Sequence, residues 1–482
     1  MSTNEQVSYR RVKSWQLFLA PAVTCVPTMF VVLMTFASYV AAGVYGIATV
    51  LAGTLITGSR IFDAITDPII ALFSDRLNSK FGRIRPLAII GWVITSLAVF
   101  IMFRWGWGAG ENRVLPFILI YMLYVIGYTI FNIGINMIGP VMTNEPKQRA
   151  SFGRWQAVYT TVLSSTISII LSKLLMPRHN YQMGLPLFAD LALFVVCASG
   201  LLLVISLVVV TIAKVDVPET YKDMHTDPVK FRDIWDVFIH NRPFQMYTIA
   251  AASDKLSLQT ASQSAITVMV FGIVMGDYSF NGTLTFVNMW VTLALLVFAV
   301  SHFAGKSGMK KAVTQWTAIC IGVYALMFIF MRSVDTLSIT SSNLLKIVFI
   351  CLFCAMGASK MACSSVTDPM RYDVIDYEMS RSGRYMPAVV NAAYSFIDKL
   401  ISSLAATIVA LSVATIGYTA SMPQATDALT PGIFNVAMFL WLGVPILGWI
   451  CTLIAMKFYK LDKETMVEVQ KKNAAIKAGK AQ

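Results

Sequence analysis

Residues 187–213 read LFADLALFVVCASGLLLVISLVVVTIA, a stretch in which Asp190 is the only charged residue. A helix needs about 20 apolar residues to cross the hydrocarbon core of a bilayer, so this stretch predicts a transmembrane helix. Backbone groups in lipid must be hydrogen-bonded within the segment, which favours a helical protein throughout the membrane. The stretch therefore predicts an all-α membrane protein.

The same pattern recurs along the chain and predicts twelve spans. Of the 482 residues, 57% are hydrophobic and 13% are charged, whereas soluble proteins have about 45–50% apolar and about 25% charged residues. This composition excludes an ordinary soluble protein and leaves no room for a large soluble domain. The predicted spans are 14–41, 44–73, 86–106, 115–142, 155–176, 187–213, 244–275, 280–304, 312–331, 344–370, 387–417 and 432–456.

The basic residues are distributed very unequally between the two sets of loops. The loops on the side of the termini hold 28 Lys and Arg residues, and the opposite loops hold 6. Because cytoplasmic loops are enriched in Lys and Arg, both termini are expected in the cytoplasm. Topology thus accounts for the net charge of +13, and nucleic-acid binding is not expected.

The longest internal loop divides the predicted spans into two sets of six. The expected parts are an N-terminal bundle at 1–213, a cytoplasmic linker at 214–243, a C-terminal bundle at 244–457 and a cytoplasmic tail at 458–482. The loop at 75–83 has a weaker counterpart at 305–311, as expected for two related halves. This layout is typical of a secondary transporter whose halves rock against each other.

A few ionisable residues remain within the predicted spans, where a charge is costly and usually functional. The basic ones are Arg60, Lys255, Lys360 and Lys399, and the acidic ones are Asp63, Asp67, Asp254, Asp368 and Asp398.

The second predicted span carries the densest group of these charges. Arg60, Asp63 and Asp67 have helical spacing that places them on one face. Two carboxylates four residues apart can share a monovalent cation or a proton, which predicts a cation site at Asp63 and Asp67. A salt-bridge network that joins helices is the structural alternative.

Lys399 is the predicted partner of this group, with Arg60 as a second coupling residue. A lysine that exchanges carboxylate partners when a cation arrives would couple ion binding to conformation. A static ion pair between helices is the alternative. Asp254 and Lys255 are neighbours about 100° apart on a helix, so they are not expected to face the same way.

Uncharged polar residues mark the predicted substrate site. Tyr128, Asn132 and Asn136 follow one stripe of the fourth span, and Asn391 and Tyr394 lie early in the eleventh. Amides and phenols both donate and accept hydrogen bonds, which suits sugar hydroxyls. Polar contacts between helices are the alternative for each residue.

The segment RIFDAITDP at 60–68, followed by GRIRP at 82–86, closely resembles the signature of the glycoside-pentoside-hexuronide cation symporters, which include melibiose permease. Residues 241–243, 373–384 and 459–462 resemble the same family. The resemblance implies a major facilitator fold and symport of a sugar or glycoside with sodium, lithium or a proton. It also implies that Asp63 and Asp67 bind the cation beside Lys399.

Departures from the family pattern limit the expected substrate. Melibiose permease holds galactosyl hydroxyls with acids in its first and fourth spans. The aligned positions of this chain are Pro27 and Asn132, and its first predicted span contains no acid. A galactoside held by paired carboxylates is therefore not expected. Arg154 and Lys360 make an anionic hexuronide the alternative to a neutral glycoside or pentoside.

Other functions are weighed against symport. A carrier of a non-sugar amphiphile or metabolite, or a sensor without transport, would use the same span pattern. No nucleophile–base set, phosphate loop or metal-ligand spacing indicates an enzyme. No cofactor is expected, and the coupling ion is expected to be Na⁺ or H⁺. We expect a monomer in a bacterial-type inner membrane. The loops at 75–85 and 371–384 are expected to form conformational latches.

Overall fold

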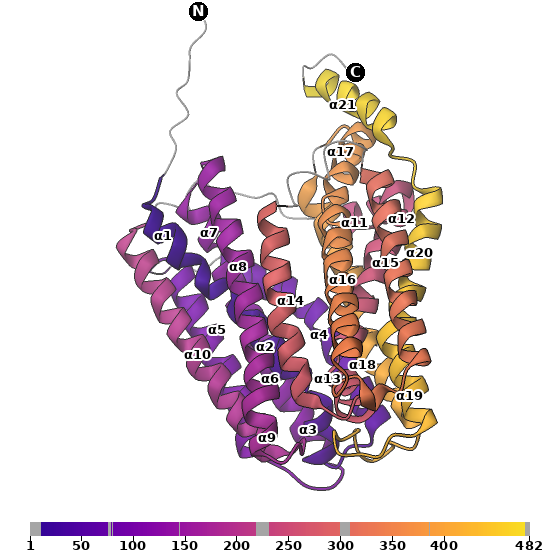
Figure 1. The fold of residues 1–482 in the computed structure, drawn as a ribbon. Coiled ribbons are helices and arrows are strands. Elements are labelled where there is room, and N and C mark those ends of the chain that lie inside the picture. The colour runs from indigo at the N-terminus through magenta and orange to yellow at the C-terminus, as the bar shows by residue number, and fades with distance from the viewer. Residues whose placement is uncertain are drawn as a thin grey trace, which may run out of the picture. The chain divides into compact units, whose positions relative to one another are not determined.

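The computed structural model describes residues 11–75, 79, 81–143, 145–217, 231–298, 309–384 and 386–477. Within these residues every regular element is helical (Figure 1). The middle of the predicted linker, at 218–230, and the end of the tail lie outside the described residues.

The first part of the chain forms the helices that correspond to predicted spans one to six. They are α1 (Ser14–Leu19), η1 (Ala20–Cys25), α2 (Val26–Met34), α3 (Ala37–Gly43), α4 (Thr49–Asp75), α5 (Ile84–Phe100), η2 (Ile101–Trp105), α6 (Val114–Asn136), α7 (Ile138–Met142), α8 (Pro146–Ile170), η3 (Leu171–Leu175), α9 (Met176–Arg178) and α10 (Leu185–Ile212).

The second part begins with α11 (Phe231–His240), which precedes predicted spans seven to twelve. The helices that follow are α12 (Arg242–Ala261), α13 (Ser264–Thr267), η5 (Val268–Val274), α14 (Tyr278–Phe298), α15 (Met309–Ser333), η6 (Thr336–Ser338), α16 (Asn343–Thr367), α17 (Met370–Ser382), α18 (Pro387–Ala414), α19 (Pro431–Met438), η7 (Phe439–Gly443), α20 (Val444–Phe458) and α21 (Lys463–Lys477).

Each predicted span coincides with a helix or with consecutive helices of the described chain. Nine of these are long and apolar enough to cross a membrane, and the pair Arg242–Ala261 and Ser264–Val274, bent by 53°, makes a tenth. Of the other two, α4 carries several charges, and α14 ends where the described residues end. The protein is therefore a multi-pass membrane protein of helical architecture.

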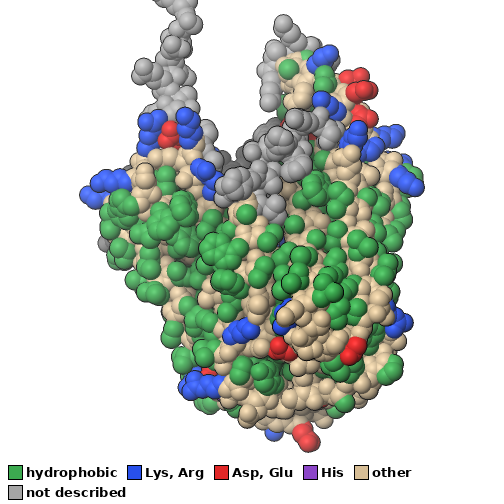
Figure 2. Space-filling view, in the orientation of Figure 1, with side chains coloured by type: hydrophobic (Ala, Val, Ile, Leu, Met, Phe, Trp, Pro, Cys, Tyr) green, Lys and Arg blue, Asp and Glu red, His purple; other side chains and the backbone are tan. Residues whose placement is uncertain are grey.

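The apolar surface fits a lipid environment. On α10, exposed hydrophobic side chains recur at helical spacing, at Leu193, Leu201, Val204 and Val208. A water-soluble helix would bury such a stripe, whereas hydrocarbon solvates it. Figure 2 shows hydrophobic side chains over the flanks of the helices, with many of the Lys and Arg side chains near their ends.

The helices group into two compact units, and the division passes through α4. One unit contains Met1–Ala48 and Phe62–Thr226, and the other contains Thr49–Ile61 and Asp227–Gln482. The first half of α4 joins the second unit because it packs closely on α18. A Cβ on Gly53 would lie 2.6 Å from the Cβ of Ala410, and Thr57 Oγ1 donates to the Ser403 carbonyl at 2.8 Å. The predicted bundle boundaries, which include residues 49–61 in the N-terminal bundle, remain a prediction.

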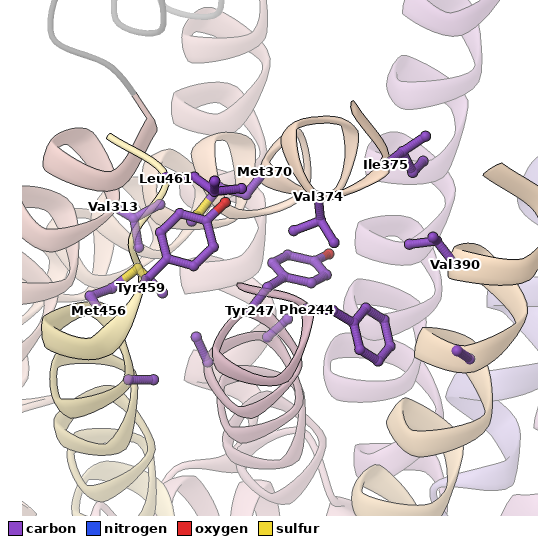
Figure 3. Packing of buried hydrophobic residues seen from close by; sticks show 14 of the residues in the cluster. Phe244, Tyr247, Val313, Met370, Val374, Ile375, Val390, Met456, Tyr459 and Leu461 are labelled. Carbon is purple, nitrogen blue, oxygen red and sulfur yellow. The ribbon is translucent and has the colours of Figure 1, made fainter. Parts of the chain in front are cut away.

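A buried core joins the loop helices of the second unit to its spans. It includes Phe244 and Tyr247 of α12, Val374 of α17 and Tyr459 beyond α20. Figure 3 shows the rings of Phe244 and Tyr247 below Val374, and the ring of Tyr459 beside Leu461. This packing fixes α17 and the start of the tail against α12.

Candidate functional site

The carboxylates of Asp63 and Asp67 meet a single hydroxyl from α6. Thr129 Oγ1 lies 3.0 Å from Asp63 Oδ1 and 3.0 Å from Asp67 Oδ1. Asp63 is 6% exposed, Thr129 is 5% exposed and Asp67 is partly buried. A hydroxyl has one proton, so it can donate to only one of the two carboxylates at a time. The structure thus gathers three oxygen-bearing side chains from two helices at one point.

Tight packing between α5 and α6 sets the position of Thr129. A Cβ on Gly127 would lie 2.7 Å from the backbone nitrogen of Thr95, and one on Gly91 would lie 2.3 Å from that of Phe131. Small residues let transmembrane helices approach this closely and leave little freedom to rotate. The face of α6 that carries Thr129 is therefore fixed.

Sequence reasoning did not select Thr129. Thr129 follows Tyr128 in the sequence, but it does not belong to the set of polar residues spaced four apart, Tyr128, Asn132 and Asn136. A hydroxyl at bilayer depth among apolar residues was the available signal. Thr66, also near the carboxylates in the sequence, bonds back to its own helix at the Phe62 carbonyl, 3.1 Å away.

The predicted substrate residues of α6 are only partly available for binding. Tyr128 is partly buried and its ring stacks on that of Tyr124, with centroids 5.6 Å apart. Asn132 Nδ2 donates to the Tyr128 carbonyl at 2.9 Å, so this donor is engaged in its own helix. Asn136 is exposed, as is Arg154 on α8.

The second unit contains the other predicted substrate and coupling residues. Tyr394 donates to Asp398 Oδ1 at 3.4 Å, and its ring lies 5.3 Å from that of Tyr247. The guanidinium carbon of Arg371 lies 5.3 Å from the centroid of the Tyr394 ring. Tyr394 is thus tied into a polar cluster. Asn391 is exposed, whereas Arg60, Lys360 and Lys399 are partly buried.

The predicted coupling group is divided between the two units. Asp63 and Asp67 belong to the first unit, and Arg60 and Lys399 belong to the second. The exchange of carboxylate partners by Lys399 remains a prediction.

One of the predicted latch loops is held by a carboxylate that the sequence analysis missed. Asp216 is 1% exposed and accepts hydrogen bonds from the backbone nitrogens of Arg83, Ile84 and Arg85 at 2.9, 3.2 and 3.1 Å. Arg85 Nε donates to it at 3.2 Å. The carboxylate therefore caps the N-terminus of α5, where an anion is favoured.

The glycine of this turn is required by the same contact. Gly82 has φ of +81°, and a Cβ there would lie 2.1 Å from Asp216 Oδ1. The predicted latch residue Arg83 thus contributes its backbone to the cap. The side chain of Asp75 lies outside the described residues.

The other predicted latch loop forms α17 and a buried charge network. Glu378 is 0% exposed, accepts from Asn241 Nδ2 at 2.8 Å and pairs with Arg381 at 2.9 Å. Arg381 also contacts Asp236 on α11. The hydrogen bond from Arg381 holds the pKa of Asp236 below its ordinary value. α11 is therefore tied electrostatically to α17.

Comparisons with known proteins place these features in a family. The family model described as MFS/sugar transport protein matches residues 17–463. The inner membrane symporter YicJ of Escherichia coli (strain K12) is 22% identical over 436 residues, which cover 89% of this chain and 88% of that protein. The isoprimeverose transporter of Lactiplantibacillus pentosus is 24% identical over 453 residues, which cover 92% and 88%.

Solved structures share the fold at low identity. The nucleoside transporter NupG superposes with a TM-score of 0.59 at 12% identity, covering 93% of this chain and 99% of that one. A structure from a study of proton-dependent oligopeptide transporters superposes with a TM-score of 0.58 at 12% identity, covering 95% and 100%.

Proposed function

Because the chain belongs to the MFS/sugar transport protein family and has its major facilitator fold, we propose that it couples the uptake of a sugar or glycoside to a Na⁺ or H⁺ gradient. The family consists of transporters, so the protein is a transporter and not an enzyme.

The observation that carries the proposed ion coupling is the sharing of Thr129 by Asp63 and Asp67. Two carboxylates close together repel each other when both are ionised, and either a cation or a proton relieves that repulsion. A hydroxyl can turn a lone pair toward a cation as readily as it donates to a carboxylate. The three oxygens therefore suit a small monovalent cation, and the two acids suit a proton.

Ion binding would change the charge that the rest of the coupling group experiences. In the proposed cycle, neutralisation of Asp63 and Asp67 releases Lys399 and Arg60 from their attraction, and the protein then binds solute. If the ion increases the affinity for the solute by some factor, the solute must increase the affinity for the ion by the same factor. Alternating access of two rocking halves then carries both across.

The proposed substrate is a neutral glycoside or pentoside. One similar protein is named for isoprimeverose and another is named a lactose permease. Polar residues suited to hydroxyl groups would bind it. These are Tyr128, Asn132, Asn136, Asn391 and Tyr394. Arg154 and Lys360 would be engaged instead if the substrate were an anionic hexuronide.

The proposed orientation places both termini in the cytoplasm of a bacterial-type cell, with the protein monomeric in the inner membrane. The excess of Lys and Arg in one set of loops supports this orientation.

Reconstituted vesicles test the proposed function. Uptake of a panel of labelled pentosides, β-glycosides and glucuronides is measured at fixed pH with and without a Na⁺ gradient, and then with a pH gradient alone. We expect accumulation of at least one compound that depends on one of the gradients. Accumulation of amphiphiles alone, or of nothing under either gradient, would contradict sugar symport.

A further inference from the structure

A buried acid in the second unit has no part in the proposed cation site. Asp254 of α12 is 8% exposed, and its Oδ1 accepts a hydrogen bond of 2.8 Å from Trp449 Nε1 of α20. Trp449 is 0% exposed. A buried polar group is normally held in this way by a specific partner.

The indole donor is held rigidly. Its ring meets that of Tyr324 edge to face, with centroids 4.6 Å apart. The preceding residue, Gly448, packs so closely on α12 that a Cβ would lie 1.9 Å from Ser257 Oγ. The helices α12 and α20 therefore interlock beside Asp254, and the donor cannot turn away.

The charges around Asp254 compensate it without direct contact. Lys360 on α16 and the adjacent Lys255 interact with it electrostatically, as does Asp368 with the opposite sign. In the described chain no Lys or Arg nitrogen comes within 4.0 Å of this carboxylate. Lys255 is exposed while Asp254 is buried, as the helical spacing predicted.

The other neighbours are thiol and phenol side chains. They come from α15 and α16 and comprise Cys320, Tyr324 and Cys363. On α18, Asp398 interacts with Lys255. A carboxylate at this depth without a direct cationic partner is costly as an anion, and a proton removes that cost.

We propose that Asp254 is a proton-binding site of the C-terminal half, distinct from the cation site at Asp63 and Asp67. A proton from water bonds to the oxygen that Trp449 does not contact, and its return to water restores the carboxylate, whose charge Lys360 partly compensates. The indole N–H can only donate, so it accommodates both forms of the acid but offers no lone pair to a metal cation. The carboxylate is thus the only metal ligand of this pair, whereas a single carboxylate oxygen is enough to bind a proton.

Infrared difference spectroscopy of the purified full-length protein tests this directly and needs no transported solute. A protonated carboxylic acid gives a C=O band that shifts in D₂O and disappears when the acid ionises. We expect such a band in the wild type, titrating with pH, and its loss in Asp254→Asn. The matched variant Asp398→Asn, which neutralises another partly buried acid of the same unit, should retain it.

A second variant keeps the test decisive if Asp254→Asn does not fold. Trp449→Phe removes the indole donor but retains an aromatic ring, so the band should persist at an altered frequency. Asp67→Asn should leave the band unchanged, which separates this site from the proposed cation site. A band that survives in Asp254→Asn, an unaltered frequency in Trp449→Phe, or no titrating band in the wild type would overturn the proposal.

Discussion

Two acidic sites of the first unit differ in the groups seen to contact them. Asp216 accepts hydrogen bonds from three backbone N–H groups and an arginine side chain, all of which can only donate. Asp63 and Asp67 share the hydroxyl of Thr129, which can also accept. Groups that can only donate hydrogen bonds stabilise a carboxylate as an anion. A hydroxyl can instead turn a lone pair toward a cation. We therefore expect Asp216 to be structural, and the proposed functional acids are Asp63 and Asp67.

The largest expected effect is on transport, when one acid of the α4 pair is neutralised. Asp67→Asn removes one charge of the pair, so we expect concentrative uptake into vesicles to be abolished while the apparent melting temperature in detergent stays near that of the wild type. Asp190→Asn, which keeps an acceptor for His179, is the matched control. Uphill accumulation by Asp67→Asn equal to that of the wild type would remove Asp67 from the mechanism.

The opposite pattern is expected for the structural acid. Asp216→Ala leaves the N-terminus of α5 and the Arg85 side chain without their buried anion, at a cost of about 2–4 kcal/mol. Thermal unfolding in detergent should therefore begin at clearly lower temperature, with Asp216→Asn between this variant and the wild type. Equal melting temperatures for all three would show that the cap contributes no stability.

A smaller effect sharpens the role of the hydroxyl. Thr129→Val keeps the shape of the side chain but removes its oxygen, and the loss of one hydrogen bond to a charged group predicts about a tenfold rise in the half-saturating concentration of the coupling ion. Thr129→Ser should behave like the wild type. The measurement is the dependence of uptake on the concentration of the coupling ion, for both variants. An unchanged ion dependence in Thr129→Val would show that Thr129 does not bind the ion.

The smallest effect concerns the charge network between α11 and α17. Because Arg381 lowers the pKa of Asp236, this pair stabilises the protein at pH values above the ordinary Asp pKa of about 3.9 and is lost as the pH falls through the lowered value. The Asp236 side chain is 46% exposed, so the contribution should stay below about 1 kcal/mol. Melting curves of wild type and Asp236→Asn should differ slightly at pH 7 and converge in strong acid. A constant difference would exclude this linkage.

The architecture can be predicted from the sequence because the hydrophobicity and charge of each span are local properties of consecutive residues. Spans such as 187–213 are long enough to be recognised by themselves, and the spacing of Asp63 and Asp67 is a property of one helix. Thr129, Asp216 and Trp449 escaped because their significance arises from contacts between segments far apart in the sequence. The close packing of Gly53 and Thr57 on α18 is likewise a contact that no local pattern encodes.

The central claim is that the acid pair of α4 binds an ion that travels with a solute. The most direct test imposes only a gradient of an accumulated glycoside across reconstituted vesicles and follows entry of labelled sodium and of protons reported by an internal dye. Coupling is reciprocal, so glycoside entry should drive one of the two ions uphill in the wild type and neither in Asp67→Asn. Glycoside entry without ion movement, or equal ion movement in the variant, would contradict the account.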